Sequence, residues 1–199
     1  MTEYEEVIWK KDQLVAGIDE VGRGPIAGPL VVCAVVLPIN FFDSRINDSK
    51  KLSKKKREEL FEVIINKALA IEVEVVNEKT VDQLNIYQAT KKAMEAVASR
   101  IPAKYCLIDA MKLDSEKACT SIIKGDLKSI SIASASIIAK VIRDQIMTNF
   151  DKVFPEYDFK NNKGYPTKKH KQALLDNDYI FLHRKTYNPI KTMILESSK

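Results

Sequence analysis

The amino-acid sequence predicts an α/β domain built on a mixed five-stranded sheet flanked by helices. Three observations predict it: five short apolar or alternating segments, helical-period segments interleaved with them, and a change to polar, basic composition after Phe154-Pro155. The chain of 199 residues fits a single domain over 1–199. Within it, we expect residues 1–150 to form the α/β core and residues 151–199 to form an appended basic helical subregion.

The strands are expected over 14–18, 29–38, 70–77, 105–110 and 119–126. Segments 14–18 and 29–38 are nearly continuous apolar runs, as in buried strands, whereas 70–77 alternates and predicts a half-exposed strand. The order of three strands followed by helix, strand, strand and helix favours a mixed sheet.

The helices are expected from Ser53, a plausible N-cap, to about residue 70, then over 86–100, 129–150 and 167–177. Pro102 ends the second of these helices. Small residues in the first half of 129–150 would let that helix approach the sheet closely. Residues after 177 are expected to form an irregular tail.

The net charge of +5 comes from 32 basic and 27 acidic residues. Residues 49–57 hold six cations, and residues 160–171 hold five lysines. Such blocks occur at phosphate contacts, but also on solvated helix faces. There is no apolar run near the ~20 residues of a membrane span, and the acidic N-terminus lacks a signal core. The three cysteines, Cys33, Cys106 and Cys119, are an odd number and each stands in an apolar stretch. We therefore expect buried thiols in a reducing cytosol.

Carboxylates follow the apolar segments at the expected strand ends. Asp19 and Glu20 follow 14–18, Asp109 follows 105–108, and Asp126 follows a further apolar stretch. If these strands are neighbours, the four acids converge, and their mutual repulsion calls for a cation. Oxygen ligands alone suit Mg²⁺ or Mn²⁺ better than zinc. An isolated Asp-Glu pair, by contrast, is usually a solvated turn.

The stretch IDEVGRGP, residues 18–25, places an arginine between two glycines directly after the acids. Gly22 and Gly24 allow backbone amides to approach a ligand closely, and Arg23 offers a fork of donors for phosphate. Competing motifs are missing from the sequence: His170 and His183 lack zinc-site spacing, and neither GxSxG nor a phosphate-binding loop occurs. The pattern favours chemistry on a phosphodiester.

Six segments then carry a family resemblance. They are GIDEVGRGPIAGPLVVCAVVL (17–37), INDSKKLSKKKRE (46–58), LIDA (107–110), KGDLKSISIASASIIAKVIRD (124–144), GYPTKKH (164–170) and HRKTYNPI (183–190). In this order they resemble bacterial ribonuclease HII, of the type 2 ribonuclease H family. Ser134 stands where that family often has alanine.

The resemblance implies a ribonuclease H-like fold and a ribonuclease H endonuclease. Such an enzyme would cleave RNA within RNA–DNA hybrids. It would also cleave duplex DNA that contains a single ribonucleotide, on the 5′ side of that ribonucleotide. It implies metal-binding catalytic acids Asp19, Glu20, Asp109 and Asp126, a 2′-hydroxyl reader made of Gly22, Arg23, Gly24 and Tyr165, and phosphate contacts from Ser49, Lys50 and Lys51. The cofactor would be Mg²⁺ or Mn²⁺, residues 151–199 would bind substrate, and the enzyme would be a cytoplasmic monomer that does not engage membranes.

Two other functions stay open at this point. The chain could be a nucleic-acid-binding module whose acids are structural, or a metal-dependent nuclease of the same broad fold acting on branched DNA. A ribonuclease HIII is disfavoured, because no additional N-terminal domain precedes the core. Asp144, on the helix at 129–150, could reach the acidic cluster or form a helix-terminal salt bridge.

Overall fold

The computed structural model describes residues 1–47, 49 and 52–197. Lys50 and Lys51 therefore lie outside the described residues. The chain divides into two units. The first comprises Met1–Val21, Val31–Val75 and Thr90–Val141, and the second comprises Gly22–Leu30, Val76–Ala89 and Ile142–Lys199.

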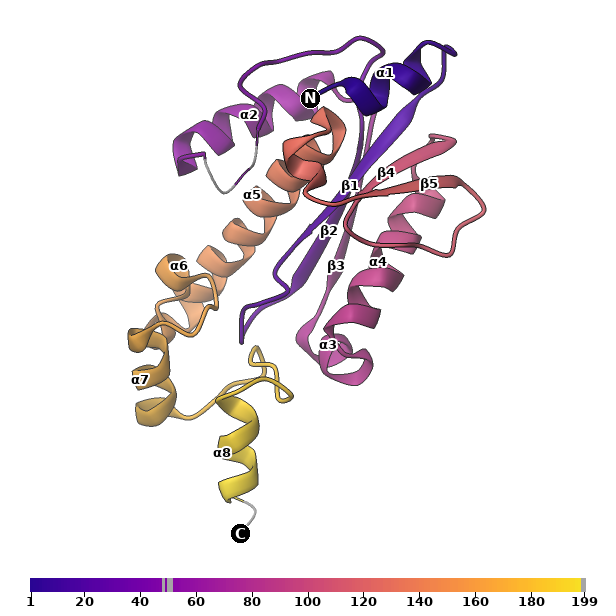
Figure 1. The fold of residues 1–199 in the computed structure, drawn as a ribbon. Helices are drawn as coiled ribbons and strands as arrows, with labels where there is room; N and C mark the ends of the chain where they lie inside the picture. The colour runs from indigo at the N-terminus through magenta and orange to yellow at the C-terminus, as the bar shows by residue number, and fades with distance from the viewer. Residues whose placement is uncertain (48, 50–51, 198–199) are drawn as a thin grey trace. The chain divides into compact units, whose positions relative to one another are not determined.

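The first unit is built on a five-stranded sheet in the order β3-β2-β1-β4-β5 (Figure 1). The strands are β1 (Val15–Val21), β2 (Leu30–Val36), β3 (Ala70–Val76), β4 (Tyr105–Asp109) and β5 (Ala118–Ile122). Strand β1 pairs antiparallel with β2 and parallel with β4, and β4 pairs parallel with β5. The predicted mixed five-stranded sheet is confirmed.

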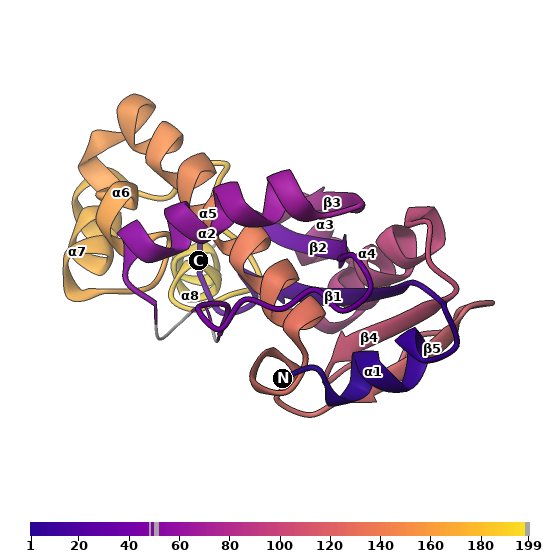
Figure 2. The same ribbon diagram turned by 90° about the horizontal axis from the view of Figure 1, so that it is seen from above.

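Helices cover both faces of this sheet. They are α1 (Glu3–Trp9), α2 (Lys54–Lys67), most of α4 (Ile86–Arg100) and the first half of α5 (Ile130–Val153). Helix α2 and this half of α5 lie on one face, and α4 lies on the other (Figures 1 and 2). The Ser53 side chain accepts a hydrogen bond from the Lys56 amide and caps α2, as the sequence predicts.

Helix α5 approaches β1 at backbone distance. A Cβ atom placed on Gly17 would lie 2.0 Å from the carbonyl carbon of Ser131, a separation that real atoms do not reach. Ala133, Ser134 and Ala135, in the first half of α5, are fully buried. The small residues of both elements therefore permit the close approach that the sequence predicts.

The second unit has its own apolar core, made of Ile26, Ala27, Met147, Tyr157, Phe159, Ala173, Leu174, Leu182 and Ile190. Its helical elements are α3 (Glu78–Leu84), the second half of α5, η2 (Pro155–Tyr157), α6 (Phe159–Asn162), α7 (Lys168–Asn177) and α8 (Ile190–Ser197). Within this core the Tyr157 and Phe159 rings stack with centroids 5.4 Å apart.

Several sequence-based boundaries were wrong. The fifth strand ends at Ile122 and not at 126, because Lys124 takes a left-handed conformation and the chain turns into the 3-10 helix η1 (Gly125–Leu127). The expected irregular tail contains α8, whose Ile190 is buried in the second core. Cys33 and Cys106 are buried as expected, but Cys119 is partly exposed.

Two short helices, α1 and α3, were also not expected. Helix α1 is held by the buried carboxylate of Glu5, whose Oε1 accepts hydrogen bonds from Ser129 Oγ at 2.5 Å and from the Ser131 amide at 3.0 Å. These partners are more than 120 residues away in sequence, so no local pattern indicates them. Among the described residues, no helix is both long and apolar enough to span a membrane.

Candidate active site

Asp19 and Asp109 lie next to each other on two parallel strands, where Asp109 is the last residue of β4 and Asp19 stands two residues before the end of β1. In the β1–β4 register Ile18 pairs with Ile108, so the following residues are the two aspartates. Gly17, two residues before Asp19, faces α5, and side chains two apart on a strand share a face. Asp19 and Asp109 therefore project toward the α5 face, from strands about 4.8 Å apart.

The carboxylate of Asp19 is buried, with 5% of the residue exposed. Its Oδ1 accepts a hydrogen bond from the Glu20 amide at 2.7 Å. Burial raises the pKa of Asp19 well above its ordinary value, and the negative charges of Glu20 and Asp109 raise it further. A hydrogen bond from Ser136 acts in the opposite direction. The ionised group is destabilised in this position, and a nearby cation would relieve that destabilisation.

Asp126 is brought toward Asp109 by the turn after β5. Asp109 Oδ1 accepts a hydrogen bond from the Gly125 amide at 2.7 Å, and Asp126 follows at once in η1, with 7% of the residue exposed. A Cβ atom on Gly125 would lie 2.6 Å from the Ile132 side chain and 3.3 Å from Asp109 Oδ1. A side chain at this junction would therefore displace the tip of Ile132.

Glu20 belongs to the same electrostatic group, but it is the next residue along β1. Its side chain therefore starts on the opposite face of the strand from Asp19. Within the described part of the chain, no three His, Cys, Asp or Glu side chains are already arranged to hold a metal ion. The donor set consists of carboxylate oxygens alone, which fits Mg²⁺ or Mn²⁺ in chemistry.

In the second unit, the loop Gly22–Pro29 is held by two buried arginines. The Arg143 guanidinium donates to the carbonyls of Pro29, Lys163 and Ala27 at 2.8, 2.9 and 3.2 Å. The Arg184 guanidinium donates to three carbonyls of the same loop. Burial lowers the pKa of Arg143 to about 10, so its side chain stays charged at neutral pH. The loop is thus fixed from inside by charge-assisted hydrogen bonds.

The two glycines of this loop differ in their requirements. Gly22 has a φ of +101°, and a Cβ atom there would lie 2.4 Å from Arg143 Nε and 2.6 Å from the Pro29 carbonyl oxygen. Gly24 has open space, with Tyr165 Cε1 as its nearest neighbour at 3.6 Å from the position of a Cβ atom. Tyr165 is 44% exposed. Gly22 therefore serves the packing of the loop, and Gly24 and Tyr165 lie together at its surface.

The family model for Ribonuclease HII matches residues 16–188. The chain belongs to the ribonuclease HII family. It is 51% identical over 197 residues to Ribonuclease HII of Enterococcus faecalis, covering 98% of this chain and 77% of that relative. The predicted family and enzyme class, a ribonuclease H endonuclease acting on RNA in RNA–DNA hybrids, are confirmed.

Solved structures confirm the ribonuclease H-like fold. The ribonuclease H2 of Pyrococcus horikoshii OT3 superimposes with a TM-score of 0.77 at 26% identity, covering 94% of this chain and 99% of that one. Bst-RNase HIII, in a structure with Mn²⁺, has a TM-score of 0.65 at 15% identity and covers 93% of this chain and 70% of that one. At that identity the second likeness concerns the fold alone.

In the first unit, Ser49 is linked to Asp19 through Ser136. Ser49 Oγ and Ser136 Oγ are 3.0 Å apart and buried, and Ser136 hydrogen-bonds the side chain of Asp19. Arg57 Nη1 donates to the Ser49 carbonyl at 2.9 Å. Ser49 therefore has internal partners and is 3% exposed, which is little surface for the phosphate contact that the resemblance implies.

The two buried arginines that hold the loop Gly22–Pro29 were not identified from sequence. Arg143 and Arg184 are fully buried, yet in sequence they are ordinary basic residues in a basic chain. Asp144 does not stand at a helix end, because α5 continues to Val153, so the expected helix-terminal position was wrong. Its backbone carbonyl accepts a hydrogen bond from Lys163 Nζ at 3.2 Å.

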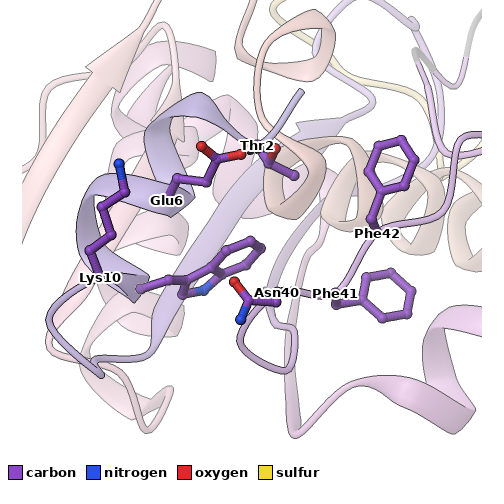
Figure 3. A pocket seen from close by; sticks show the side chains of 7 residues that line it. Thr2, Glu6, Lys10, Asn40, Phe41 and Phe42 are labelled. Carbon is purple, nitrogen blue, oxygen red and sulfur yellow. Dashed lines mark hydrogen bonds between the residues drawn. The ribbon is translucent and has the colours of Figure 1, made fainter.

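The first unit also contains a pocket of about 550 Å³, which is lined by none of the site residues described above. Figure 3 shows it between α1 and the loop after β2, lined by Thr2, Glu6, Trp9, Lys10, Asn40, Phe41 and Phe42. Its one carboxylate, Glu6, accepts a hydrogen bond from Thr2 Oγ1 at 2.6 Å. None of the predicted site residues that the structure describes lines this pocket.

Proposed function

We propose that this enzyme hydrolyses the phosphodiester 5′ to a single ribonucleotide embedded in duplex DNA, as well as RNA strands in hybrids. Water is the nucleophile, and the products carry a 3′-hydroxyl and a 5′-phosphate. The observation that carries the proposal is the position of Asp19 beside Asp109 on two adjacent strands, with Gly22-Arg23-Gly24 following Asp19 within five residues of sequence.

Asp19, Glu20, Asp109 and Asp126 would hold Mg²⁺ or Mn²⁺. When bound, such an ion supplies a Lewis acid that lowers the pKa of a bound water and stabilises the leaving oxygen. The raised pKa of the buried Asp19 supports this assignment, because burial and the neighbouring acids disfavour the ionised carboxylate unless a positive charge is close. By fixing the position of a bound cation, the carboxylates would also orient the scissile phosphate.

Recognition of the ribonucleotide falls to residues of the second unit. The backbone of Gly22, Arg23 and Gly24 would hydrogen-bond the 2′-hydroxyl, the group that distinguishes RNA from DNA at one position. Tyr165, beside Gly24 and half exposed, would stack on the adjoining sugar. Lys50 and Lys51, together with the basic region 151–199, would bind phosphates, whereas the buried Ser49 has no part in this contact. A plot of log affinity against log salt concentration should therefore have a slope of about −0.9 per neutralised phosphate.

The direct test uses a DNA duplex with one ribonucleotide, incubated with and without Mg²⁺ or Mn²⁺, with products resolved to nucleotide length. We expect one cut 5′ to the ribonucleotide, only with the ion, and a product with a 3′-hydroxyl. A 2′,3′-cyclic phosphate would mean that the 2′-hydroxyl attacks and would refute the water mechanism. Asp19→Asn should bind the duplex and fail to cut it.

An all-DNA branched junction, run in the same assay, separates the alternative nuclease activity, since that activity has no use for a 2′-hydroxyl reader. Cleavage of the junction at the rate of the ribonucleotide duplex would favour the alternative. We further propose that the enzyme is a cytoplasmic monomer, which sedimentation at equilibrium would test.

A further inference from the structure

Two adjacent residues of the second unit, His183 and Arg184, point buried side chains at different parts of the proposed reader. An isolated β-bridge joins His183 to Ala27, and the Arg184 amide donates to the Ile26 carbonyl at 2.9 Å. His183 is 1% exposed and Arg184 is fully buried. Because successive side chains of an extended segment point in opposite directions, one dipeptide can hold two separate structures.

Arg184 holds the glycine loop. Its Nη2 donates to the carbonyls of Gly22 at 2.6 Å and Gly28 at 2.8 Å, and its Nη1 donates to the Arg23 carbonyl at 3.1 Å. The Tyr187 hydroxyl donates to the same Arg23 carbonyl at 2.9 Å. A lysine could not reproduce this set, because its single nitrogen lacks the planar fork of donors.

His183 holds Tyr165 through a second histidine. His170 Nδ1 lies 2.9 Å from the Tyr165 carbonyl oxygen, which can only accept, so Nδ1 carries the hydrogen and Nε2 is an acceptor. The two Nε2 atoms are 3.0 Å apart, so His183 Nε2 must donate. His183 Nδ1 then accepts from the Ile180 amide at 3.1 Å. The other tautomer of His183 would set two lone pairs against each other.

This relay requires both rings to be neutral. Burial lowers the pKa of His170, and burial together with His170 lowers the pKa of His183 to about 4. The aromatic rings of Tyr157 and Phe159 surround the pair, with centroids 5.0 Å from His183 and 5.4 Å from His170 respectively. At neutral pH a single direction of hydrogen bonding therefore runs from the Ile180 amide to the Tyr165 carbonyl.

We propose that His183 and Arg184 are positioning residues that keep Tyr165 and the Gly22–Gly24 backbone at a fixed separation, and thereby set the preference for ribose over deoxyribose. The ring of Tyr165 lies 3.6 Å from the position of a Cβ atom on Gly24, so a small shift of either part opens or closes that contact. The inference rests on the proposed function, because it assigns the selectivity of the same reader.

The test compares affinities for two duplexes that differ by one 2′-hydroxyl, measured by fluorescence anisotropy with EDTA so that no cleavage occurs. The variants are Arg184→Lys, His183→Leu and the conservative His183→Gln, whose amide can still donate to His170. The matched control is Arg45→Lys, which changes an exposed arginine of the first unit paired with Asp43.

We expect Arg184→Lys and His183→Leu to reduce the preference for the ribonucleotide duplex about tenfold, the effect of losing a hydrogen bond to a charged or buried group. Affinity for the all-DNA duplex should change less than about twofold, because phosphate contacts supply it. His183→Gln and Arg45→Lys should keep the preference. A role in stability alone would lower the melting temperature and leave the ratio of the two affinities intact.

The outcomes separate the two proposals. If the wild-type enzyme shows no preference for the 2′-hydroxyl, the proposed reader itself is refuted. If it shows the preference and both Arg184→Lys and His183→Leu retain it, the positioning role is refuted. If Arg184→Lys does not fold, the comparison of His183→Leu with His183→Gln decides.

Discussion

Acidification should destabilise this protein through His183, and the size of the effect follows from its burial. The pKa of His183 is lowered from its ordinary 6.5 to about 4, because the ring is buried and faces His170. Between these two values the unfolded chain binds a proton that the folded chain does not, so stability falls as the pH falls. Well above pH 6.5 the ring is neutral in both states, and this contribution is constant.

The magnitude can be worked out from the two pKa values. Integrated from pH 7 to pH 5, one such group lowers the free energy of unfolding by about 2 kcal/mol, and by about 3 kcal/mol when both states have titrated fully. That is a large share of the 5–15 kcal/mol typical of a folded domain. His170, whose pKa is also lowered by burial, adds to the loss in the same direction.

The assay is urea unfolding at a series of pH values from 7 to 4.5, for the wild type and His183→Gln. We expect the free energy of unfolding to depend more steeply on pH in the wild type. The difference in slope should correspond to at most one additional proton bound on unfolding. Equal slopes in both proteins would refute the reasoning, since the glutamine cannot titrate. As a control, the slope of the free energy of unfolding against urea concentration should be the same in the two proteins, which shows that the substitution does not alter the denatured state.

Three further predictions concern other buried positions. Asp19→Asn should raise the urea midpoint at pH 7 without divalent ions, because it removes a buried negative charge. Each unit by which burial raises the pKa of Asp19 corresponds to about 1.4 kcal/mol of destabilisation of the ionised form. A lower midpoint would contradict this. Gly17→Ala should destabilise the fold by about 3 kcal/mol or more, since its methyl group would meet the backbone of α5 at 2.0 Å. Gly24→Ala should change the melting temperature little, because the nearest neighbour of its methyl group is 3.6 Å away. Cys106, whose pKa burial raises to about 12, should resist a thiol reagent at pH 8 in the native protein and react after unfolding; rapid native reaction would be inconsistent with its burial.

The secondary structure was largely predictable because its signals are local. The apolar runs at 14–18 and 29–38, the alternation at 70–77 and the Ser53 cap all produced the expected elements. The helices that were missed, α1, α3 and α8, are eight residues or shorter, and they carry too few turns for periodicity to mark them. Their stability comes from distant partners, such as the Ser129 hydroxyl that binds Glu5.

By itself, the sequence determined the family, the order of the sheet-forming segments and the identity of the acids that could meet. Only the tertiary structure decided which groups are neighbours: Asp19 beside Asp109, Ser49 against Ser136, and Arg184 on the carbonyl of Gly22, 162 residues away. The physical reason is that periodicity and capping depend on residues within a few positions of one another. A buried guanidinium or a neutral histidine pair is defined by partners that folding alone brings into reach.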